Sequence, residues 1–155
     1  MLAQPHDREF YERELASFLP DRIFDAHTHL WRDKPYNSMF KLAGNDGDID
    51  YDRYVALMDD LHPGRPVHGL FIPAFPAEHP ETIAEANDWI AQQTAAHESN
   101  RGLFFVLPQD DPEWVREEVR RLGLHGLKCY HLFADKKPTF EAQIPDYLPE
   151  ALVQV

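Results

Sequence analysis

Apolar and polar positions follow two patterns along the chain. Four segments are dominated by apolar residues and are expected to form strands, at 23–31, 67–73, 101–108 and 124–131. The intervening segments 50–61, 81–98 and 111–122 repeat apolar residues at three- and four-residue spacing, which is typical of amphipathic helices. Strands that alternate with helices predict an α/β fold, in which about four parallel strands are joined by crossover helices.

A further helix is expected ahead of the first strand. Asp7 is suited to cap its amino end, and Pro20 would stop it after Leu19. The pattern divides the chain into an N-terminal helix at 1–20 and a main body at 21–155. We expect the apolar stripe of this helix to pack across one end of the body or against a partner.

The first strand carries two histidines separated by one residue, in the sequence Ile-Phe-Asp-Ala-His-Thr-His-Leu-Trp. Regular alternation would place Asp25, His27 and His29 on one face of this strand, and its apolar residues on the other. Two neutral imidazoles on one face near the end of a strand can converge on a single divalent metal. The alternative is a pair of histidines that only form hydrogen bonds at a surface.

The stretch from Asp25 to His29 resembles the amidohydrolase superfamily, in particular its amidohydrolase-related branch, whose first barrel strand ends in Asp-x-His-x-His. The resemblance implies a metal-dependent hydrolase, or in some members a decarboxylase or lactonase, on a (β/α)8 TIM-type barrel. It also implies that His27 and His29 ligate a divalent metal, with zinc expected and manganese or iron as alternatives. Asp25 would orient one of the imidazoles.

Lys128 stands out in the fourth strand, because a lysine within an apolar strand must be paired, neutralised or modified. Related amidohydrolases of the hydantoinase and dihydroorotase type carry a lysine in a similar setting, where it is carboxylated and bridges two metals. The alternative is that the Lys128 ammonium holds a substrate carboxylate electrostatically.

Three further residues are candidate substrate contacts. Tyr130 shares a face with Lys128 by alternation, and His131 lies at the end of the same strand. Trp31 immediately precedes the long segment at 32–50, whose density of turn residues predicts a loop over the substrate. In α/β barrels the loops that follow the strands lie on the same face as the chemistry.

The chain has 155 residues, whereas a complete eight-stranded α/β barrel usually needs roughly 250. The resemblance therefore covers 21–155 as the N-terminal half of a barrel, and the family's later ligands, from the fifth, sixth and eighth strands, fall outside it. We expect a fragment that is inactive alone and that is completed by a C-terminal half. The alternative is a noncatalytic half-barrel that self-associates or binds a partner chain.

Composition excludes several classes of partner. The formal net charge is −12 and no cluster of lysine and arginine interrupts it, so nucleic acids and anionic membranes are not expected ligands. The single cysteine, Cys129, allows no internal disulfide, and no apolar run has the length of a signal peptide or membrane span. These features predict a cytoplasmic protein, and the resemblance implies a small-molecule substrate.

Overall fold

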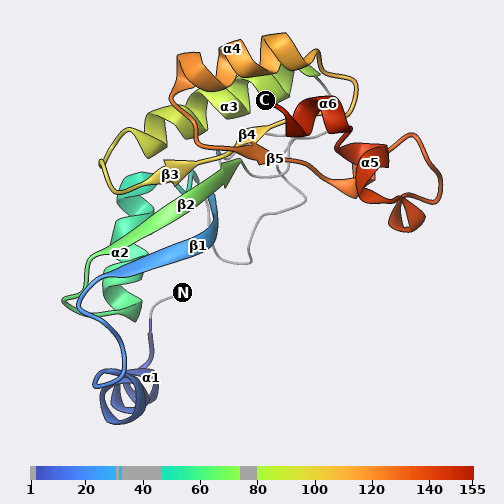
Figure 1. The fold of residues 1–155 in the computed structure, drawn as a ribbon. Helices are drawn as coiled ribbons and strands as arrows, with labels where there is room; N and C mark the ends of the chain where they lie inside the picture. The colour runs from blue at the N-terminus through green and yellow to red at the C-terminus, as the bar shows by residue number, and fades with distance from the viewer. Residues whose placement is uncertain (1–2, 31, 33–46, 74–79) are drawn as a thin grey trace.

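The computed structural model describes residues 3–30, 32, 47–73 and 80–155. Figure 1 shows strands that alternate with helices along most of this part of the chain. The strands are β1 (Ile23–Leu30), β2 (Val67–Pro73), β3 (Arg101–Gly102), β4 (Phe104–Phe105) and β5 (Leu127–Lys128). The main helices are α2 (Tyr51–Leu61), α3 (Pro80–Thr94) and α4 (Pro112–Leu122).

All strand pairs that the structure describes are parallel, so the predicted α/β class with parallel strands is confirmed. One sheet has the order β1-β2-β3, and a second, two-stranded sheet pairs β4 with β5. Only Leu103 separates β3 from β4, and its amide still donates to the Phe71 carbonyl of β2 at 2.9 Å. The strands therefore lie in chain order, and the two small sheets follow one another across β3 and β4.

A buried side chain marks the place where β2 and β4 separate. Asn87 of α3 is 1% exposed, and its amide group meets the backbone of Phe105 in β4 twice. The Phe105 amide donates to Asn87 Oδ1 at 2.7 Å, and Asn87 Nδ2 donates to the Phe105 carbonyl at 3.0 Å. Asn87 thus supplies the hydrogen bonds that a neighbouring strand would otherwise provide.

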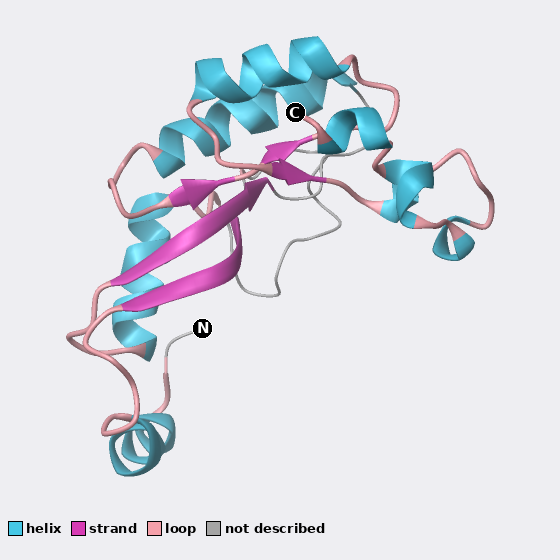
Figure 2. Ribbon diagram, viewed as in Figure 1, coloured by secondary structure: helices cyan, strands magenta, loops and turns pink. Residues whose placement is uncertain are grey.

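The helices pack against the strands through one main apolar core (Figure 2). Its buried residues come from β1, β2, β4 and from helices α2, α3, α4 and α6, and they include Leu30, Tyr54, Phe71, Ile90, Phe104, Val115 and Leu152. Local signals fix the ends of α4, because Asp111 accepts a hydrogen bond from the Trp114 amide and Gly123 adopts a left-handed conformation with φ of 63°. The sequence predicted both ends of this helix.

The N-terminal helix lies at one end of the molecule in Figure 1. It consists of α1 (Pro5–Phe10), followed by a π-helical turn, η1 (Tyr11–Leu15). Gln4 caps α1 while Asp7 occupies its third position and accepts from the Gln4 amide, so the prediction that Asp7 is the capping residue was wrong. Arg65 fastens this segment to the segment between α2 and β2, since it donates to the Tyr11 hydroxyl and to the Ala16 carbonyl.

After β5 the chain forms short elements only: the 3-10 turns η3 (His131–Phe133) and η4 (Thr139–Glu141), and the helices α5 (Ile144–Tyr147) and α6 (Glu150–Val153). Leu152 of α6 is fully buried and belongs to the main core. The segment after β5 is therefore a series of single turns that returns to the body at α6.

Candidate metal centre

A bulge in β1 sets the positions of the two candidate ligands. The register with β2 pairs Asp25 with Gly69 and Thr28 with Phe71, so β1 has one residue more than β2 over this interval. Ile23 packs against the core before the bulge, and Thr28 and Leu30 are buried after it. The prediction of regular alternation through this strand was therefore wrong, because Phe24 is 48% exposed while Thr28 and Leu30 face the core.

His27 lies within the bulge and His29 follows it, and their rings lie on the same side of β1, as predicted. Their Nε2 atoms are 3.2 Å apart, and their ring centroids are 5.1 Å apart with an interplanar angle of 54°. His27 is exposed, whereas His29 is half-buried. The two nitrogens therefore point toward a shared region at the carboxyl end of β1.

The surroundings of His29 lower its pKa and so favour the neutral ring. Burial is the main cause that lowers its pKa, and the neighbouring His27 ring and the Lys128 ammonium act in the same direction. A hydrogen bond to the Pro73 backbone opposes them. Proline has only a carbonyl to offer, so His29 is the donor, and a ring that donates from one nitrogen keeps a lone pair on the other.

Asp25 does not have the position that the sequence suggested. Its Oδ1 accepts a hydrogen bond from the backbone amide of His27 at 3.0 Å, and not from an imidazole. Its charge also acts on Tyr54 of α2, which lies on the core side of the strand. Asp25 therefore contacts the backbone of the bulge, and it does not share the face of the two rings.

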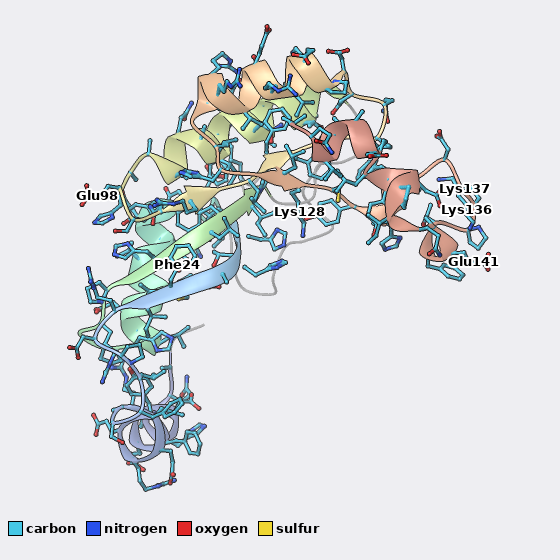
Figure 3. All side chains as sticks on the ribbon, viewed as in Figure 1. Phe24, Glu98, Lys128, Lys136, Lys137 and Glu141 are labelled. Carbon is cyan, nitrogen blue, oxygen red and sulfur yellow. The ribbon has the colours of Figure 1, made fainter. Side chains whose placement is uncertain are left out.

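Lys128 of β5 lies near both Tyr130 and His29. Its Nζ is 4.7 Å from the centre of the Tyr130 ring, which agrees with the prediction that the two side chains share a face. Figure 3 shows the Lys128 side chain on the side of β5 turned away from α3 and α4. Among the described residues no carboxylate lies within ion-pair distance of Lys128, so its charge is available to a ligand.

The other predicted contacts have separate outcomes. His131 is exposed in η3, and its Nδ1 is 3.1 Å from the Thr139 carbonyl of η4, so the ring is engaged with the segment after β5. Tyr130 packs with Phe105, whose ring centroid is 5.3 Å away, and burial raises the pKa of Tyr130 to about 12. Trp31 lies outside the described residues.

Sequence reasoning missed Tyr54. It was expected only as part of the apolar face of α2, but its hydroxyl is buried beside the bulge. Burial and, next, the charge of Asp25 raise the pKa of Tyr54 to about 12, while the Thr28 hydroxyl lowers it. A tyrosine on an otherwise apolar helix face was the only signal in the sequence, because a buried phenol generally needs a polar neighbour.

Within the described ranges, no group of three or more histidine, cysteine or acidic side chains is arranged to hold a metal ion. No helix in the same ranges has the length and apolar character needed to cross a membrane.

Comparison of the chain with family models, with curated proteins and with solved structures finds no match.

Proposed function

We propose that this chain provides part of the metal centre of an amidohydrolase-type, metal-dependent hydrolase, built on a (β/α)8 barrel of which it forms the first strands. The observation that carries the proposal is the 3.2 Å separation of the Nε2 atoms of His27 and His29. Two nitrogen ligands at about 2.0–2.1 Å from a tetrahedral zinc ion would be about 3.3 Å apart. The rings are thus spaced as a pair of ligands would be.

The protonation state of His29 supports the same assignment. A metal ligand must be deprotonated at the ligating nitrogen, and the lowered pKa of His29 favours the neutral ring. Its hydrogen bond to the Pro73 backbone resembles the outer contact that commonly fixes the orientation of a ligating histidine. A hydrogen bond between the two rings is the competing explanation for their short separation.

Two imidazoles fit a divalent metal as two of its ligands. Zinc is the expected ion, with manganese or iron as alternatives, because imidazole suits several first-row metals. When bound, such an ion lowers the pKa of a coordinated water and polarises a carbonyl oxygen. Since the described residues supply no third ligand, we infer that the remaining donors come from outside these residues or from a second chain.

Lys128 places a positive charge close to His29, at the candidate metal centre. Its ammonium is close enough to His29 to lower the pKa of that ring, and it has no carboxylate partner among the described residues. This environment favours a small substrate that carries a carboxylate, whether the reaction is hydrolysis of an amide or lactone or a nonoxidative decarboxylation. A carboxylated Lys128 that bridges two metals is the alternative role.

A second candidate function is association of a noncatalytic half-barrel. In the described part of the chain β1 pairs only with β2, so its other edge has no strand partner. Phe24 on this strand is half exposed, and pairing of an edge strand is a common route to oligomers. A second copy or a complementary C-terminal half would cover this edge.

The test is zinc titration by calorimetry of the wild-type chain beside His27→Ala and His29→Ala. We expect each substitution to weaken binding on the order of a hundredfold or more, since loss of even an outer contact costs 10–100-fold. His97→Ala is the matched control and should bind as the wild type does. Equal zinc binding by all four proteins would contradict the proposal, and light scattering with and without zinc measures association separately.

A further inference from the structure

The bulge determines which face of β1 carries the imidazoles. Ile23 packs on the core side, and if β1 alternated regularly, His27 and His29 would keep its phase and also point toward the core. The additional residue between Asp25 and Thr28 reverses the phase, so Thr28 and Leu30 take the core side instead. The face of β1 on which the two rings meet therefore depends on this bulge.

One hydrogen bond lies within the bulge. The Asp25 carboxylate accepts a hydrogen bond from the His27 amide at 3.0 Å. A bulge leaves a backbone group outside the ladder, and an aspartate two residues earlier can satisfy it locally. Asp25 thus fixes the backbone of the first candidate ligand, but nothing in this contact fixes Asp25 itself.

Tyr54 is the residue of α2 that can fix Asp25. Its side chain is 3% exposed, and its ring packs edge-on against Phe71, with centroids 5.2 Å apart. Phe71 is the register partner of Thr28, at the far end of the bulge. The Tyr54 hydroxyl is buried, and both residues that flank the bulge influence its pKa, Asp25 through its charge and Thr28 through its hydroxyl.

The Tyr54 and Thr28 hydroxyls are both buried and neither has a hydrogen-bond partner among the described residues, while the Thr28 hydroxyl lowers the pKa of Tyr54. A buried hydroxyl that is unpaired is costly, so both groups favour the arrangement that brings them together. This preference links α2 to Thr28, at the far end of the bulge.

We propose that Tyr54 is a positioning residue that, with Asp25, holds the bulge at 25–28 in the form that turns the His27 and His29 rings away from the core and onto one face of β1. The inference rests on the proposed function for the identity of the ligand, a divalent metal. It goes further in assigning the geometry of the pair to a residue of a different element, α2.

The experiment compares Tyr54→Phe with Tyr51→Phe. Both tyrosines are on α2 and both rings pack edge-on against Phe71, but only the Tyr54 hydroxyl is buried beside the bulge. In zinc titrations we expect Tyr54→Phe to weaken affinity about tenfold, as other outer contacts of ligands do, and Tyr51→Phe to leave it unchanged. Asp25→Ala should weaken it by at least as much, and Asp25→Asn, which keeps an acceptor, should restore most of it.

A second readout needs no metal. Amide hydrogen exchange at His27 reports the hydrogen bond to Asp25, and we expect faster exchange in Tyr54→Phe and Asp25→Ala but not in Tyr51→Phe. If Tyr54→Phe changes neither exchange nor zinc affinity while the wild type binds zinc, the positioning role is wrong and the proposed function stands. If exchange responds as expected but His27→Ala and His29→Ala bind zinc as the wild type does, the proposed function is wrong and the role of Tyr54 in the bulge stands.

Discussion

At the carboxyl end of the strands, His27 and His29 bring two ring nitrogens within 3.2 Å, whereas at the amino end His68 and His97 stack with centroids 4.2 Å and planes 28° apart. Lone pairs lie in the plane of an imidazole, so stacked rings direct them along parallel planes and not to a common point. Close histidines are therefore not sufficient for a ligand pair. The direction that the backbone gives to each ring decides between the two cases.

The packing of the backbone also differs between the amino and carboxyl ends of the strands. At the amino end, Gly102 of β3 pairs with Phe71 and lies directly against Thr94 and Leu124. At the carboxyl end, β2 and β4 have separated and Asn87 occupies the position of a strand neighbour. The amino end is closely packed, whereas at the carboxyl end Asn87 stands between β2 and β4.

The largest effect is expected from removal of the group that keeps the strands apart. Asn87→Leu preserves volume but leaves the Phe105 amide and carbonyl without their buried partners. Each such loss costs about 1–3 kcal/mol, so the free energy of unfolding should fall by about 2–5 kcal/mol. Urea denaturation measures it, with Gln92→Leu on the exposed side of α3 as the control; similar midpoints for both variants would contradict this account of the carboxyl end.

The next effect tests the closely packed end. A Cβ added at Gly102 would lie 2.7 Å from Leu124 Cδ2 and would also clash with Thr94 Oγ1. Gly102→Ala should therefore lower stability by about 1–3 kcal/mol through overpacking. Gly126→Ala, whose Cβ would meet only Leu103 Cδ2 at 3.1 Å, should cost less. Thermal unfolding of the two variants measures which substitution lowers stability more. A Gly102→Ala variant as stable as the wild type would contradict the close packing at the amino end.

The smallest effect concerns acid. Burial is the main cause that lowers the pKa of His68 and of His125, followed by His97 for the first and Arg101 for the second. The unfolded chain then takes up protons first as pH falls below the ordinary histidine value of about 6.5, so stability decreases below that pH and levels off below the folded pKa. Urea midpoints between pH 7.5 and 5 should depend less on pH in His68→Phe than in the wild type. The exposed His6→Phe is the control, and equal slopes in all three proteins would rule out this source of acid sensitivity.

Regular periodicity made most of the fold predictable. Uniform apolar runs identified the strands, and the Asp111-Pro112 start and Gly123 stop gave the limits of α4. The pairing of Lys128 with Tyr130 also followed from alternation. These features depend on neighbours in the sequence, which is why a single sequence reveals them.

The features that could not be predicted depend on contacts between elements. The stretch from Ile23 to Leu30 reads as a regular strand, because an extra residue becomes visible only against the register of β2. Asn87 lies on the inward stripe of α3, and its spacing gives no sign that its amide meets β4. The role of Asp25 changed for the same reason, since its side chain follows the bulge and not the period of the strand.

The phase change in β1 also bears on how such a centre can arise or disappear in evolution. Loss of the single codon for Ala26 would leave Asp25 opposite Gly69 and Thr28 opposite Phe71, so the strand would become regular and both imidazoles would still point away from the core. A relative could therefore lack the bulge, carry Asp-His-x-His in place of Asp-x-His-x-His, and keep both rings on one face. The register of this strand against its neighbour would be more informative about such relatives than the spacing of the side chains they share.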